Sequence, residues 1–185
     1  NFCTVDLSAF YFDIRKDTLY CDPKNSKKRK STLLLLNIIL NTLLKWFAPI
    51  LSFTTEEIYQ LISKKDKSVH LEKFPELGKK FENKNLFNKW IELIKIRDIC
   101  NISIEEKRAT KEIGSSLEAS LRIKLDEKNM ELVKDIDLAE LCIISSVNIE
   151  ESREDTVQVE TKKALGNKCP VCWKISQKPC VRHSA

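Results

Sequence analysis

The sequence predicts a mainly α-helical protein, followed by a small α/β unit and a metal-binding tail. Only three glycines and five prolines occur in 185 residues, whereas sheets and tight turns would need more of both. Apolar residues recur at helical spacing in the first part of the chain and alternate after Ile113 and Gly114. Four potential metal ligands gather near the C-terminus. We therefore expect a helical bundle over residues 1–112, an α/β unit over residues 113–163 and a tail over residues 164–185.

The first two predicted helices follow from their apolar residues. One helix is already under way at the start of the chain and ends near Tyr20. Another covers residues 33–47, where Asn37, Asn41 and Lys45 recur every four residues and form one narrow polar stripe. A helix that is apolar around most of its circumference fits the middle of a helical bundle. It does not fit a membrane span, because its uninterrupted apolar stretches are too short and polar groups at mid-bilayer are costly.

Pro49 should end or kink this helix, and two further helices follow. Thr54 and Glu57 have the spacing of a capping box, which predicts a shorter helix through Ile62. A polar connection over residues 64–77 precedes a long helix. We expect the tryptophans of the apolar helix and of the long helix to pack in a core. The stripe of the long helix contains Leu86, Trp90, Leu93, Arg97, Cys100 and Ile104.

After Gly114 the pattern becomes that of a small α/β unit. Apolar residues alternate with charged or small polar residues over residues 117–125, which predicts a half-buried strand. We expect a short helix over residues 128–134, a second strand over residues 141–147 and a third over residues 157–159.

The sharpest chemical signal is the pair of motifs Cys169-x-x-Cys172 and Cys180-x-x-His183, with seven residues between them. Two thiolates at this spacing can reach one metal ion, and a tetrahedral zinc ion takes four cysteine or histidine donors. So short a segment cannot bury a hydrophobic core, whereas zinc binding can supply folding energy on the order of 10–16 kcal/mol. We therefore predict one structural zinc ion on these four residues, with no open position for catalysis. The alternative is a disordered tail that carries cysteines.

Basic residues gather in two places, although the net charge is only +5. Residues 162–185 carry five lysines and one arginine without an acid, whereas residues 126–160 carry eleven acids against three bases. Separated basic clusters fit a polyanionic partner such as a nucleic acid. The alternative is a solvated lysine-rich surface in a protein from an AT-biased genome. The first cluster is the run Lys24, Lys27, Lys28, Arg29 and Lys30.

The chain carries no arrangement that would indicate catalysis. Three glycines cannot build a glycine-rich phosphate loop. Of the two histidines, His183 belongs to the metal motif, and His70 is expected at an ordinary surface or packing position. Seven cysteines without a secretory leader fit reduced thiols in a cytoplasmic protein better than a disulfide framework. Because an amphipathic pattern is already under way at Phe2, with no methionine before it, we expect a piece of a larger protein.

Four segments follow one another in an order found in a known family. They are LSAFYFDIRKD at residues 7–17, LKWFAPILSFTTEEI at residues 44–58, IGSSLEA at residues 113–119, and KALG at residues 163–166 leading into the first metal motif and Trp173. Together they resemble the C-terminal region of bacterial isoleucyl-tRNA synthetases, class I enzymes that join isoleucine to its tRNA.

The resemblance implies a division of labour. The helical part would be an anticodon-binding bundle of the class I synthetase type, the α/β part a junction domain, and the tail a zinc module that completes recognition of the anticodon stem. The partner would be isoleucine tRNA, with no DNA and no membrane, and the protein would be a monomer. Such enzymes carry their aminoacylation and editing domains upstream. The chain has no counterpart of their ATP-binding signatures, so ATP and magnesium would belong to a catalytic domain elsewhere.

The tail departs from the family pattern around its last ligand. His183 stands where the family usually has a cysteine, the segment between the two motifs is shorter than usual, and Val171 occupies a position that is often polar or basic. Arg182 matches the arginine that commonly precedes the final ligand. Imidazole is a good zinc donor, so a site with three cysteines and one histidine is chemically sound.

These observations predict a chain that holds the anticodon arm of a tRNA. The basic run from Lys24 to Lys30 would contact phosphates, which position RNA without reading its sequence. Trp173 and Arg182 would face bases, because loop bases are read by stacking on aromatic or guanidinium planes; the alternative for Trp173 is packing over the zinc turn. For the whole chain, the alternative is a zinc-containing helical protein-interaction module without RNA selectivity. The RNA-contacting candidates of the tail are Trp173, Lys174, Lys178 and Arg182.

Overall fold

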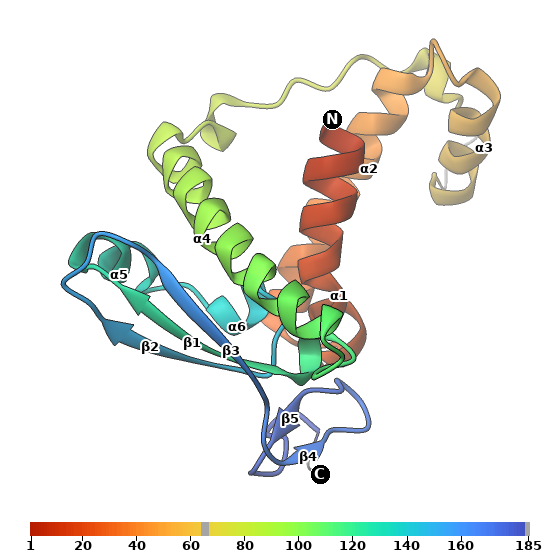
Figure 1. Cartoon of the computed structure of the whole chain (residues 1–185). Helices are drawn as coiled ribbons and strands as arrows, with labels where there is room; N and C mark the ends of the chain where they lie inside the picture. The colour runs from red at the N-terminus through yellow and green to blue at the C-terminus, as the bar shows by residue number, and fades with distance from the viewer. Residues whose placement is uncertain (64–66, 184–185) are drawn as a thin grey trace. The chain divides into compact units, whose positions relative to one another are not determined.

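The computed structural model describes residues 1–63 and 67–183, which form two compact units. The larger unit contains Asn1–Asp17 and Asn83–Ala185, and the smaller unit contains Thr18–Glu82. Figure 1 shows the helices and strands of both units.

The smaller unit is helical. α2 (Lys27–Phe47) and α3 (Ser52–Ile62) pack against each other and against a short 3-10 turn (Val69–Leu71), and a further 3-10 turn follows at Lys79–Phe81. α2 ends before Pro49, as predicted, because proline cannot donate the next helical hydrogen bond. The buried residues of this small core are Leu44, Ala48 and Val69.

Acidic side chains tie the first 3-10 turn to the two helices. Lys45, the last residue of the predicted polar stripe, pairs with Glu72 at 3.1 Å, and the Tyr59 hydroxyl donates to the same carboxylate at 3.0 Å. These two hydrogen bonds lower the pKa of Glu72. The carboxylate of Glu56 accepts from the backbone N–H of Val69 at 2.9 Å. The polar stripe of α2 therefore ends in a local network within this unit.

The apolar surface of α2 is only partly covered, which corrects the prediction that this helix lies in the middle of a bundle. Leu34 is 63% exposed, and Trp46, which was expected in a core, is 46% exposed. The buried positions include Thr32 and Thr42, whose hydroxyls donate to carbonyls one turn earlier and so need no other partner. In the described part of the chain, no helix combines the length and apolarity that a membrane span needs.

α3 begins earlier than predicted, and the capping box predicted at Thr54 and Glu57 is wrong. The N-cap is Leu51, which has no capping side chain. Thr55 is buried, and its hydroxyl donates to the Leu51 carbonyl at 2.9 Å. The N–H of Leu51 itself donates to the carbonyl of Phe47. The turn that ends α2 therefore already sets the start of α3, and no side chain is needed to cap it.

Two long helical segments belong wholly or partly to the larger unit. The first has π-helical hydrogen bonding over Phe2–Phe12 and continues as α1 (Asp13–Cys21). The residues of this segment up to Asp17 belong to the larger unit, and those from Thr18 onward belong to the smaller unit. The end of α1 confirms the predicted helix end near Tyr20. The second segment, α4 (Lys84–Ala109), confirms the predicted long helix.

The apolar stripe of α4 enters the core only after its first turns. Leu86 is 49% exposed. Trp90 is half-buried and packs edge-on against Phe10, with ring centres 6.2 Å apart. Leu93, Cys100 and Ile104 of the stripe are buried, and so is Ile96, which the predicted stripe did not include.

Three strands form a mixed sheet in the order β2-β1-β3 (Figure 1). β1 (Ala119–Leu125) lies parallel to β2 (Ser146–Glu151) and antiparallel to β3 (Gln158–Lys163). α5 (Glu127–Val133) and α6 (Leu138–Leu141) connect β1 to β2, because a parallel pair needs a crossover. Alternate residues of β1 are buried, as predicted. They share one core with α4, α1 and both short helices.

The second strand starts five residues later than predicted, at Ser146 rather than at Leu141. The apolar run that suggested a strand belongs to the end of α6 and to a buried turn, in which Cys142 and Ile144 are covered. Ile143 between them has a φ of 55°. A β-branched residue in this left-handed region is strained, and surrounding packing must hold it there.

Asn83 caps α4, since its side-chain oxygen accepts from the N–H of Leu86 at 2.9 Å. We expect Asn83→Ala to lower the free energy of unfolding by about 1 kcal/mol, the usual effect of losing such a cap. Urea unfolding followed by circular dichroism measures this change. Asn85→Ala, at an exposed position in the first turn, is the control, because alanine favours helix more than asparagine does. An equal loss in both variants would show that the cap is not its source.

The predicted mainly helical chain with a small α/β part is confirmed. All seven cysteines have free thiols, and His70 is exposed. The domain division into residues 1–112, 113–163 and 164–185 stays a prediction. Contacts group α4 with the sheet rather than with α2 and α3.

Candidate metal centre

Two short strands hold the first pair of potential ligands, in a segment of residues 167–183 that we call the knuckle. β4 (Asn167–Lys168) and β5 (Ile175–Ser176) pair antiparallel, with the Cys-x-x-Cys motif in the turn between them. The N–H of Cys169 donates to the carbonyl of Lys174 at 2.9 Å, and the N–H of Trp173 donates to the carbonyl of Cys169 at 3.0 Å. Trp173 closes the turn with a left-handed φ of 62°.

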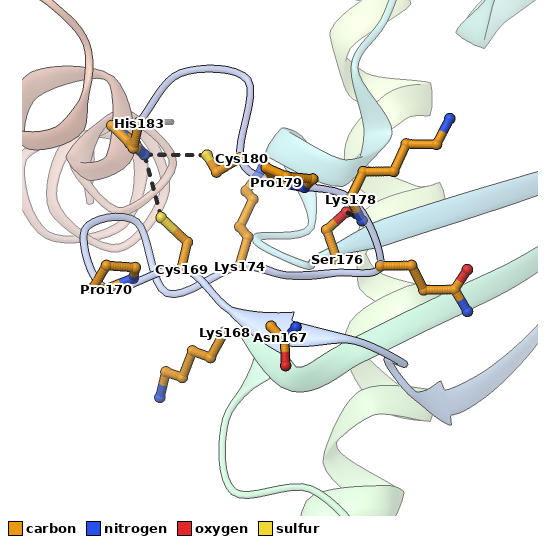
Figure 2. Close-up of a pocket in the computed structure, with 11 residues that line it drawn as sticks. Asn167, Lys168, Cys169, Pro170, Lys174, Ser176, Lys178, Pro179, Cys180 and His183 are labelled. Atoms are coloured by element: carbon orange, nitrogen blue, oxygen red, sulfur yellow. Dashed lines mark hydrogen bonds between the residues drawn. The ribbon is translucent and has the colours of Figure 1, made fainter. Parts of the chain in front are cut away.

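The second pair of ligands comes from the turn after β5. The N–H of His183 donates to the carbonyl of Cys180 at 3.0 Å. His183 Nδ1 lies 3.2 Å from Cys180 Sγ and 3.4 Å from Cys169 Sγ, and Figure 2 shows the imidazole facing both sulfurs. Cys172 Sγ lies 3.8 Å from Cys180 Sγ. All four ligand atoms lie within 4.8 Å of one another.

This spacing fits a tetrahedral metal ion. Metal–sulfur bonds of about 2.3 Å in a tetrahedron place two sulfurs about 3.8 Å apart, which is the separation of Cys172 and Cys180. Three thiolates and one imidazole are also a donor set that zinc favours. With four protein ligands such a site has no position for substrate or water. The cluster could therefore hold a structural metal ion.

The backbone of the knuckle favours the thiolate form at two of the three cysteines. Hydrogen bonds from the N–H groups of Cys172 and Val171 lower the pKa of Cys169 to about 6. Burial raises the pKa of Cys172 to about 11. Burial also acts to raise the pKa of Cys180, but hydrogen bonds from the N–H of Arg182 and from the Cys172 thiol outweigh it, so that this pKa lies below its usual value.

Metal affinity should therefore fall as the pH falls, because a thiol must lose its proton before it coordinates. Cys169, with a pKa of about 6, is already deprotonated at neutral pH, whereas Cys172, with a pKa of about 11, must release its proton on binding. We expect the apparent zinc affinity to fall at least about tenfold for each pH unit below neutrality, and more steeply once Cys169 is protonated as well. Competition with a colorimetric chelator across this range measures it. A flat profile would show that these thiols are not ligands.

Two side-chain contacts join the knuckle to the rest of the larger unit. Ser145 Oγ donates to the Leu117 carbonyl at 2.5 Å and accepts from the N–H of Ile175 at 2.6 Å. The guanidinium of Arg182, predicted to contact RNA, forms an ion pair with Asp17. Neither Ser145 nor Asp17 was predicted, because their partners in the knuckle lie 30 and 165 residues away in the sequence. No local pattern marks such distant contacts.

The basic run predicted to contact RNA lies at the start of α2, in the smaller unit. Ser26 caps this helix, and no acidic residue lies in its first turn. Arg29 is half-buried and donates to the carbonyl of Asp22 at 2.8 Å, so this member of the run has a local structural role. The exposed members of the run are Lys24, Lys27, Lys28 and Lys30.

The other RNA candidates lie on the surface of the knuckle. Trp173 is 59% exposed, and the Lys168 Nζ lies 5.6 Å from the centre of its ring, so the residue is not buried over the turn between β4 and β5. Lys174 and Lys178 line a pocket of about 380 Å³ together with Cys169, Cys180 and His183 (Figure 2). Of the tail candidates, Lys174 and Lys178 thus lie beside the potential metal ligands.

Comparison with known proteins decides the family. Residues 1–125 match the family described as the anticodon-binding domain of tRNA ligase. The chain belongs to this family. Over 184 residues it is 63% identical to a protein named isoleucine–tRNA ligase from Pelagibacter ubique (strain HTCC1062), a match that covers 100% of the chain and 20% of the relative.

Proteins of the same name in other bacteria are also similar to this chain. The identity is 43% over 188 residues for Bradyrhizobium diazoefficiens and 42% over 176 residues for Methylacidiphilum infernorum, each match covering 95% of the chain and 19% of the relative. The chain thus spans about a fifth of the length of the curated relatives it matches. The predicted resemblance to isoleucyl-tRNA synthetases is confirmed, and these matches extend well beyond residue 125 toward the knuckle.

Proposed function

We propose that the chain is the C-terminal part of an isoleucine–tRNA ligase and that it holds the anticodon arm of isoleucine tRNA. The observation that carries this proposal is the identity of 63% across the whole chain to a protein of that name. Holding the anticodon arm would let the distant acceptor end reach a catalytic pocket elsewhere in the parent enzyme, where ATP and magnesium would act. The chain would contribute binding and orientation but no reacting group. The parent enzyme would work as a cytoplasmic monomer.

The knuckle would hold one structural zinc ion on its four candidate ligands. Zinc would supply folding energy, on the order of 10–16 kcal/mol for segments of this kind. The residues of the chain orient the donors: N–H groups of the first turn point at Cys169, and the His183 N–H fixes the second turn on the Cys180 carbonyl. A neutral imidazole with its proton on Nε2 would present Nδ1 to the metal.

The start of α2 supports a phosphate contact. The N-terminus of a helix carries a partial positive charge, so each basic residue in the first turn typically costs about 0.3–1 kcal/mol. The first four residues of α2 are Lys27, Lys28, Arg29 and Lys30, and no acid lies in this turn; the nearest carboxylate in the sequence, that of Asp22, accepts from the hydroxyl of the N-cap Ser26. A backbone phosphate bound there would reverse this repulsion, because it can accept from helix N–H groups and from lysines together.

The knuckle would supply the contact to unpaired bases. Trp173 is exposed on a turn that the metal would order, and loop bases are commonly recognised by stacking on such rings. A ring whose backbone is already fixed loses little conformational freedom when it binds. Lys174 and Lys178 would contact phosphates next to the stacked base.

The competing function is a zinc-containing protein-interaction module. One observation favours it: Leu165, Val171 and Val181, in or next to the knuckle, are 73%, 50% and 96% exposed. Apolar side chains at a surface are typical of protein contacts when they form a patch. This function predicts weak dependence on salt and no preference among tRNAs.

Replacing Lys27 and Lys30 by alanine should weaken the binding of all tRNAs alike. Each lost phosphate contact should lower the slope of log affinity against log salt by about one unit, because fewer counterions are released. Filter-binding titrations at several salt concentrations measure this slope. Lys128→Ala with Lys134→Ala, at exposed positions in the acidic part of the chain, is the matched control. An unchanged slope in the first variant would exclude the start of α2 as a phosphate site.

A further inference from the structure

Arg182 contacts the metal centre and α1 at the same time. Its backbone N–H donates to the sulfur of Cys180. Its guanidinium forms a two-point ion pair with Asp17, with distances of 2.7 Å from Nη1 to Oδ2 and 3.0 Å from Nη2 to Oδ1. The two side chains are 31% and 23% exposed, so water only partly screens the pair. Two parallel charge-assisted hydrogen bonds fix both distance and orientation, which a single contact would not do.

Asp17 is held in place by its own helix. Ile14, one turn earlier in α1, is buried in the core of the larger unit. Arg15 pairs with Glu140 of α6 at 2.9 Å, and these side chains are 27% and 13% exposed. α1 is therefore anchored next to Asp17 by a buried side chain and by a second ion pair. The carboxylate offers Arg182 a fixed partner rather than a mobile one.

We propose that Asp17 is a positioning residue for the metal centre: it holds the turn from Cys180 to His183 where these last two ligands can complete the tetrahedron. The inference rests on the metal binding proposed above. Without the ion pair, more of the free energy of metal binding would be spent on ordering this turn. By linkage, a bound metal should strengthen the ion pair by the same factor by which the pair strengthens metal binding.

The same geometry gives Arg182 a role that differs from reading RNA bases. Both terminal nitrogens of its guanidinium already bind the carboxylate of Asp17. In this role Arg182 connects the metal centre to α1, which continues along the chain into the unit that carries the basic run. Arg182 would then affect RNA binding through the order of the knuckle.

Zinc affinity of the full chain, measured by competition with a chelator, tests this proposal. Asp17→Asn removes the charge but keeps the size of the side chain, and we expect it to lower zinc affinity about tenfold, the lower end of the range seen when outer partners of metal ligands are removed. Arg182→Lys keeps the charge but loses the two-point geometry, so we expect about a threefold loss. Asp13→Asn is the control, because its ion pair with Lys16 is exposed, and its zinc affinity should stay unchanged.

Exchanging the two residues, with Asp17→Arg and Arg182→Asp in one chain, should restore most of the affinity. The absorption spectrum of the cobalt-loaded chain should be the same in all variants, because the ligand set does not change. Wild-type zinc affinity in Asp17→Asn would overturn the proposal. A loss that the exchange does not rescue would also overturn it, since Asp17 would then act through another partner. A wild-type chain that binds zinc but no tRNA would contradict the proposed function. The comparison of zinc affinities between the wild type and the variants would still test the role of Asp17.

Discussion

Cys172→Ser is expected to weaken the binding of zinc to the chain strongly and, with it, the selective binding of tRNA. Cys172 is 5% exposed, and its sulfur lies 3.8 Å from that of Cys180. A serine hydroxyl stays protonated at neutral pH and is a poor zinc donor, so three ligands would remain. If one donor in four supplies about a quarter of the 10–16 kcal/mol of binding energy, zinc affinity should fall about a hundredfold or more. The turn that presents Trp173 would then lose its order.

Zinc content after gel filtration, together with chelator competition, measures this loss. Cys3→Ser is the matched control, because Cys3 is an exposed free thiol outside the donor set. This control should retain about one zinc ion per chain and the wild-type affinity for tRNA. A Cys172→Ser chain that keeps the wild-type zinc affinity would contradict the assignment of the four ligands.

Gly166→Ala should have the next-largest effect, because the position leaves no room for a side chain. Gly166 has a φ of +124°, and a β carbon there would lie 2.2 Å from the carbonyl carbon and oxygen of Ser176 and 2.5 Å from the backbone nitrogen of Gln177. Backbone atoms cannot move aside as a flexible side chain can. β4 and β5 would have to separate, which would open the turn they support. We expect the free energy of unfolding to fall by about 2–4 kcal/mol and zinc affinity to fall in parallel.

Gly114→Ala is the control for this substitution within the same chain. A β carbon at Gly114 would meet only the Glu118 carboxylate, at 3.6 Å, which is ordinary contact. Urea unfolding and chelator competition on both variants give the comparison. Wild-type zinc affinity in Gly166→Ala would show that the pairing of β4 with β5 does not support the metal centre.

Elements with a strong local pattern could be predicted from the sequence. The alternation along residues 119–125 marks a half-buried strand because one face of β1 is covered and the other is not. Pro49 marks the end of α2 because it removes a helical hydrogen bond. The metal motifs could also be predicted, since both ligand pairs are local in the sequence and only the contact between the pairs depends on the fold.

Other features were missed where tertiary contacts override the local pattern. The apolar run around Ile143 looks like a strand, but it is a buried turn that packing holds in a left-handed conformation. Thr54 and Glu57 have the spacing of a capping box, although the turn after α2 already starts α3 at Ser52. Asp17 could not be predicted, because nothing near it in the sequence indicates a partner 165 residues away.

The most direct test of the central claim compares the affinity of the chain for isoleucine tRNA with its affinity for a second tRNA, at one salt concentration, with zinc bound and after its removal. The anticodon-binding role predicts tighter binding of isoleucine tRNA by the zinc-loaded chain. After zinc removal, we expect both tRNAs to bind weakly and alike, through the basic start of α2 alone. Equal affinity for the two tRNAs in the zinc-loaded chain, or a preference that survives zinc removal, would contradict the account.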